Sequence, residues 1–71
     1  MTARQFRTRA VRMFRNANPG FAGDITWGYV SRPFVGKGDG LPGHRCGHFH
    51  AGGRLVVVMA TPEGSMLVRA Q

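Results

Sequence analysis

The chain has 71 residues, and we expect them to form a single small domain over residues 1–71. Ten lysines and arginines against three acidic residues give a net charge of +7, which favours an acidic partner. A single cysteine, Cys46, excludes a disulfide within the chain. The longest apolar run, residues 55–60, is far shorter than the ~20 residues that cross a membrane, so we expect no membrane contact and a cytoplasmic location.

Residues 3–16 are predicted to form one amphipathic helix. Five apolar side chains fall within about a third of the helical wheel; they are Phe6, Ala10, Met13, Phe14 and Ala17. Thr2 and Gln5 fit a capping box, in which each side chain bonds the backbone N–H of the other residue. The helix is expected to end before Asn18-Pro19-Gly20, because this sequence cannot continue it.

The same helix carries five arginines and no acidic residue. Arg4, Arg12 and Arg15 lie opposite the apolar stripe, and Arg7 and Arg9 lie at its shoulders. Arginines three positions apart repel each other by a few tenths of a kcal/mol, so packing of the apolar stripe must hold the helix. The arginines either form a solvated surface or bind anions.

The rest of the chain alternates between strand and turn signals. Residues 24–32 alternate, with Ile25, Trp27 and Tyr29 expected on one side of a strand. A glycine-rich loop follows, and residues 44–50, 54–60 and 66–70 are then predicted to form strands joined by hairpins. This order predicts an α+β protein in which one N-terminal helix packs on a three- to four-stranded antiparallel sheet, in the order α-β-β-β-β.

The strand at residues 54–60 is apolar on both faces. Leu55, Val57 and Met59 form one face, and alternate residues from Val56 to Ala60 form the other. Such strands are usually covered on both sides, but one helix covers only one face. The glycine-rich loop or a second copy of the protein should cover the other, and we expect a homo-oligomer.

The stretch GHRCGHFHAGG places four metal-binding or proton-transferring side chains at alternate positions: His44, Cys46, His48 and His50. In a strand they would share one face. This pattern permits a zinc site, a catalytic cluster or a polar strand face. Because no second Cys or His cluster exists, a four-ligand zinc site would need ligands from another copy. We expect no cofactor, with zinc as the alternative.

The order helix–strand–strand–strand is similar to the start of the double-stranded-RNA-binding fold. Within it, GHFHAGGRLVVV resembles the glycine-then-histidine strand of the HicA-like mRNA interferase toxins, with His48 in the place of their catalytic histidine. The resemblance covers about a dozen residues. The chain departs from both families in having no closing helix after its last strand. Taken alone, the resemblance implies a histidine-dependent ribonuclease.

The charge favours a non-enzymatic protein that binds nucleic acid. The residues predicted to contact nucleic acid or an acidic partner are Arg4, Arg7, Arg9, Arg12, Arg15, Arg32, Lys37 and Arg45. Four aromatic residues are candidates for stacking on bases; they are Trp27, Tyr29, Phe34 and Phe49, of which Trp27 and Tyr29 are expected in the core. The alternative is an accessory or inhibitor protein of a phage or mobile element that docks on an acidic protein surface, as a homodimer.

Overall fold

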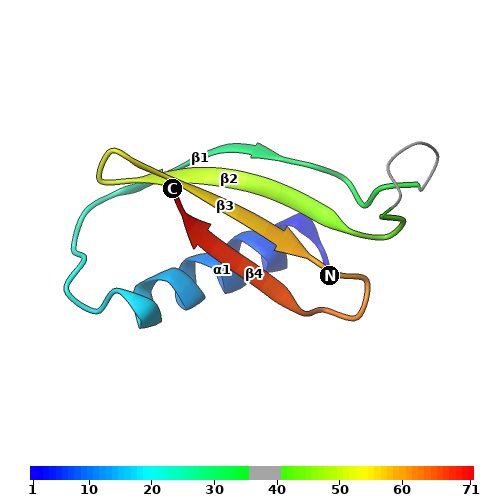
Figure 1. Ribbon diagram of the computed structural model, residues 1–71, viewed down its shortest axis with the longest axis horizontal. Coiled ribbons are helices and arrows are strands. Elements are labelled where there is room, and N and C mark those ends of the chain that lie inside the picture. Colours follow the sequence, from blue (N-terminus) through cyan, green and yellow to red (C-terminus); the bar gives the residue numbers. More distant parts are fainter. Residues whose placement is uncertain (36–40) are drawn as a thin grey trace.

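The computed structural model describes residues 1–35 and 41–71. Its elements are α1 (Ala3–Ala17), β1 (Ile25–Val30), β2 (Arg45–Ala51), β3 (Arg54–Ala60) and β4 (Met66–Ala70). The strands form one antiparallel sheet in the order β1-β2-β3-β4, and α1 lies across one of its faces (Figure 1). The predicted α+β class and α-β-β-β-β order are confirmed, with four strands in the sheet.

The predicted capping box begins α1. The Thr2 Oγ1 accepts a hydrogen bond from the backbone N–H of Gln5 at 3.1 Å, and the Thr2 N–H donates to Gln5 Oε1 at 2.8 Å. At the other end, the side-chain amide of Asn18 donates to the carbonyl of Phe14 at 2.9 Å, just before Pro19. Both ends of the helix are therefore set by side chains within three or four residues of the groups they bond.

Removal of this cap tests how far α1 depends on it. Thr2→Ala should lower the free energy of unfolding by about 1 kcal/mol, because the Gln5 N–H loses its acceptor. Urea unfolding followed by circular dichroism measures the change. Thr8→Ala is the matched control, since Thr8 is exposed inside the helix, where alanine is the better helix former. An equal loss in both variants would contradict a capping role for Thr2.

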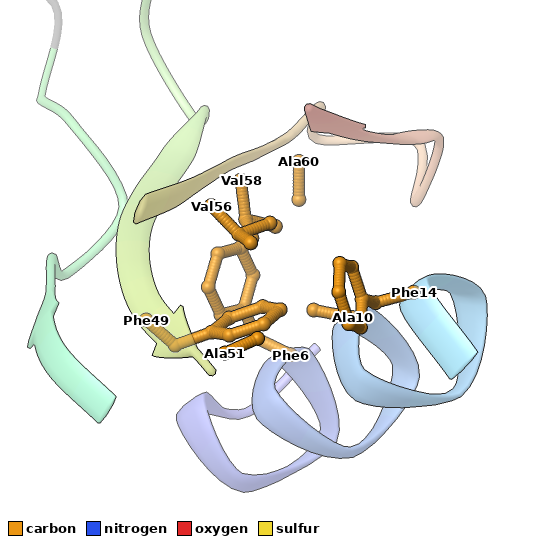
Figure 2. Packing of buried hydrophobic residues seen from close by; sticks show 8 residues of the cluster. All are labelled: Phe6, Ala10, Phe14, Phe49, Ala51, Val56, Val58 and Ala60. Atoms are coloured by element: carbon orange, nitrogen blue, oxygen red, sulfur yellow. The ribbon is translucent and has the colours of Figure 1, made fainter. Parts of the chain in front are cut away.

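The core lies between α1 and the two central strands. Phe6, Ala10 and Phe14 of the helix meet β2 and β3 (Figure 2). The strand side chains that face them are Phe49, Ala51, Val56, Val58 and Ala60. The predicted apolar stripe was too wide, since Met13 is 39% exposed and Ala17 is also exposed. The reason is that the helix contacts the sheet along a single i, i+4, i+8 ridge that ends at Phe14, which leaves Met13 beside the ridge and Ala17 past its end.

Aromatic rings make up much of this core. The Phe49 ring centroid lies 4.8 Å from that of Trp27 and 5.5 Å from that of Phe14, and Phe14 makes an edge contact with Phe21. Trp27 therefore belongs to the core, as expected. The hypothesis that Phe49 stacks on bases is wrong, because Phe49 is fully buried; for the half-buried Trp27 it stays a prediction.

A β-bulge in β1 overturns the prediction that Tyr29 points into the core. Trp27 pairs with Phe49, but the next pair is Val30 with Gly47, so three steps on β1 match two on β2. The additional residue shifts the alternation. Val30 therefore packs against the core, while Tyr29 is 58% exposed on the other side of the sheet.

The two apolar faces of β3 have different environments. Val56 and Val58 are fully buried beneath α1, whereas Leu55 and Val57 are 36% and 40% exposed on the opposite face. The β2–β3 turn consists of Gly52 and Gly53, at φ values of 57° and 85° that favour glycine. The sheet therefore has one face packed on the helix and one face that the helix does not cover.

Candidate nucleic-acid interface

The exposed surface of α1 displays the predicted arginines, with Arg4, Arg12 and Arg15 on the side away from the sheet and Arg7 and Arg9 at its shoulders. We call this surface the arginine face and define it as Arg4, Arg7, Arg9, Arg12 and Arg15, all of which are exposed. Arg4 and Arg12 are eight residues apart, or about 12 Å along the helix axis. The helix thus spaces its positive charges along one rigid element.

Two of these arginines also contact the rest of the protein. The Arg9 guanidinium donates to the carbonyl of Gly64 at 3.0 Å, which ties α1 to the turn between β3 and β4. The Arg15 guanidinium carbon lies 5.6 Å from the centroid of the Phe21 ring. Within residues 1–35 and 41–71, the side chains of Arg4, Arg7 and Arg12 make no hydrogen bond, so their donors face solvent.

The other predicted contact residues have different environments. Arg32 is exposed after β1, whereas Lys37 lies outside the described residues. Arg45 is half-buried, and its guanidinium donates to the carbonyl of Ser31 at 2.9 Å and to that of Met1 at 3.3 Å. These bonds join β2 to the N-terminus and to the segment after β1, and they use donors that a phosphate would need.

An open hollow of about 500 Å³ separates the first half of α1 from the β3–β4 turn. Arg4, Thr8 and Arg9 line its helix side, and Glu63 lines its other side. The carboxylate makes this hollow mixed in charge. It marks one border of the arginine face and is a poor site for an isolated anion.

The histidine stretch forms β2 and faces the side of the sheet opposite α1. Cys46, His48 and His50 alternate with the inward Gly47, Phe49 and Ala51, which confirms that they share a face. The His48 imidazole lies against Gly28 of β1, so closely that a Cβ on Gly28 would collide with it. His44 precedes the strand and lines a hollow with Leu41 and Met59.

This face gives the imidazoles few chemical partners. The ring centroids of His48 and His50 are 6.2 Å apart and the rings are perpendicular. Among the described residues, no three His, Cys, Asp or Glu side chains lie close enough to hold a metal ion. A zinc site here would need ligands from elsewhere, and the zinc alternative stays a prediction.

The sequence analysis did not predict that the side chains of all four strands on the face opposite α1 form one surface. We call it the open sheet face, and its members are Tyr29, Cys46, His48, His50, Leu55, Val57, Met59, Leu67 and Arg69. In the sheet register, Val57 lies between His48 and Arg69, and Met59 lies between Cys46 and Leu67. The alternation of Leu67 and Arg69 with Met66 and Val68 was a usable signal for β4. The position of Tyr29 was not predictable, because it depends on the bulge.

Together these features define a small basic α+β protein. Its helix displays arginines on one side of the molecule, and the opposite face of its sheet displays apolar side chains and histidines. In the described part of the chain, no helix is both long and apolar enough to cross a membrane. No family model, curated protein or solved structure matches this chain.

Proposed function

We propose that this protein binds nucleic acid through the arginine face of α1. The observation that carries the proposal is the chemistry of the outward side of the helix, which is polar throughout and contains no carboxylate. Its residues are Arg4, Gln5, Thr8, Arg12, Arg15 and Asn16. Arginine matches the geometry of phosphate through paired N–H donors, and it keeps its charge at any physiological pH.

The same chemistry favours a polyanion over a protein partner. Protein interfaces are anchored by aromatic or aliphatic side chains that fill pockets at their centre. The outward side of α1 offers none, since Phe6, Ala10 and Phe14 face the sheet and the exposed Met13 lies beside that ridge. A nucleic acid needs no such anchor, because contacts with successive phosphates release counterions and supply affinity without regard to sequence.

Two other functions are alternatives to nucleic-acid binding. A phage- or mobile-element-encoded accessory protein that docks as a homodimer on an acidic protein would use the same arginines. A ribonuclease would use His48 or His50, but these lie on the opposite side of the sheet from the arginine face. The arginines of α1 are therefore in no position to hold a phosphate against either imidazole, which makes the ribonuclease the weaker candidate.

Paired substitutions test the proposal. Arg4→Gln with Arg12→Gln should weaken binding to a labelled DNA duplex and to a labelled single-stranded RNA by at least about tenfold at 100 mM salt. The slope of log affinity against log salt should fall by about two, one for each lost phosphate contact. Fluorescence anisotropy between about 50 and 200 mM salt measures both quantities.

The control carries the same charge change on other surfaces. Arg54→Gln with Arg69→Gln removes two exposed arginines, on β3 and β4, that are not among the residues predicted to contact nucleic acid. This control should change affinity by less than about threefold. Loss of structure does not explain a selective effect of the helix pair, because glutamine is a good helix former and the substitutions relieve repulsion. Equal weakening by both pairs would argue against α1, and no binding of the unmodified protein at 50 mM salt would leave the acidic protein partner.

A further inference from the structure

We propose that a second copy of this chain covers the open sheet face, through a two-fold, sheet-to-sheet contact. The starting observation is the exposure of large apolar side chains there. Val57 is 40% exposed at the centre of this surface and Leu67 is 57% exposed on β4. The sheet register places them beside Met59 and Leu55, so the apolar side chains are continuous across β3 and β4. Exposed patches of this kind mark contact sites in soluble proteins.

The described part of the chain covers only one end of this face. Leu41, from the end of the loop between β1 and β2, lines a hollow with Met59 and Leu67. A second hollow, of about 400 Å³, remains open between Tyr29, His48 and Val57. The loop residues that the structure describes therefore bound the apolar surface without closing it.

The area of the face is sufficient for a weak dimer. Four strands at a spacing of about 4.8 Å make a face roughly 19 Å wide. Seven residues of β3 at about 3.3 Å each make it roughly 23 Å long. Two such faces cover roughly 900 Å² even as flat surfaces, and side-chain relief raises the accessible area further. A specific interface needs about 1,000 Å² in total, so we expect a concentration-dependent dimer of modest affinity.

The distribution of charge favours a second copy over an acidic partner at this face. Among the described residues its only arginine is Arg69, on the edge strand β4, and it holds no carboxylate. An acidic partner would be attracted more strongly to the arginine face. A two-fold axis parallel to the strands lays β4 of one copy over β1 of the other, which keeps the two Arg69 side chains apart. It also places the apolar β3–β4 half on the half that carries Tyr29 and His48.

Such a contact closes on itself. Each copy uses the same surface, so the assembly stops at two. Packed sheets lie about 10 Å apart with their strands near −30°, which the side chains of this face can fill. Both arginine faces would then remain exposed on the outside of the dimer, and dimer formation leaves the proposed nucleic-acid surface free.

Sedimentation of the full chain without nucleic acid tests the proposal. The unmodified protein should move from 7.8 kDa toward twice that mass as its concentration rises. Val57→Glu should weaken association at least about a hundredfold, because it buries a carboxylate from each copy at the centre of an apolar contact, and the desolvation cost exceeds what a pairing with the neighbouring Arg69 returns. Thr8→Glu adds the same charge on the opposite side of the protein and should leave the dimer intact. Far-UV circular dichroism checks that each variant is folded.

A second variant tests the dimer in case Val57→Glu unfolds the protein. Leu67→Glu changes a more exposed residue on an edge strand, and it should also yield monomers. A protein that stays monomeric up to about 1 mM overturns the proposal. So does a dimer that survives both glutamate substitutions, because its interface must then lie elsewhere. A monomer that still binds nucleic acid would overturn only the dimer and leave the role of the arginine face standing.

Discussion

Phe49→Ala should lower the free energy of unfolding by about 3–5 kcal/mol, the range observed when a buried aromatic residue is truncated. Phe49 is fully buried on the central strand β2 and contacts Trp27 and Phe14. A domain of this size is stable by only about 4–11 kcal/mol in total, so the variant should be close to unfolding at room temperature. Chemical denaturation followed by tryptophan fluorescence measures the loss, since Trp27 reports on the same cluster.

The size of this loss separates core from surface. Val35→Ala is the control, because Val35 is 90% exposed and should change stability by less than about 0.5 kcal/mol. Phe49→Leu should lose less than the alanine variant, because leucine fills more of the space that alanine would leave empty. A loss below about 1 kcal/mol for Phe49→Ala would mean that the ring does not hold α1 against the sheet.

Gly47→Ala should cost about 1–3 kcal/mol, although alanine normally improves the interior of a strand. An added Cβ would lie 2.6 Å from the Tyr29 carbonyl oxygen and 3.2 Å from the Phe6 ring. The first of these atoms belongs to the backbone of a paired strand, so it cannot move without disturbing the bulge. The substitution therefore strains the place where β1, β2 and α1 meet.

Gly20→Ala makes the same glycine-to-alanine change as Gly47→Ala, but here we expect no loss of stability. Nothing lies within 4 Å of an added Cβ there, and Gly20 is not among the glycines with positive φ. Alanine should leave stability unchanged or raise it by up to about 1 kcal/mol, by restricting the unfolded chain. Thermal unfolding of both variants measures the contrast. A Gly47→Ala protein as stable as the unmodified one would contradict the close approach of β1 to Gly47.

The local elements could be predicted from the residues because their signals lie within a few positions of each other. The helix was expected at residues 3–16 and is found at Ala3–Ala17, since its cap, apolar spacing and proline stop are all local. The hairpin strands were likewise predictable from alternation and glycine-containing turns. The exposure of the helix arginines also followed from periodicity alone, because the opposite side of the helix carries the phenylalanines.

Other features depended on contacts between distant segments. The bulge that turns Tyr29 outward requires the pairing of β1 with β2, and nothing within β1 specifies it. The use of Arg45 and Arg9 as donors to Met1 and Gly64 joins residues 44 and 55 positions apart in the sequence. Composition could not separate these arginines from Arg12, whose side chain makes no hydrogen bond within the described residues.

The sequence by itself therefore determined the elements of this protein, their order, and a helix with positive charge on its outer side. Only the tertiary structure decided which apolar face of β3 is buried. Val56 and Val57 are identical side chains one position apart, but the first is fully buried and the second is 40% exposed. Hydrophobicity requires burial without specifying a direction, and the side on which α1 packs supplies that direction.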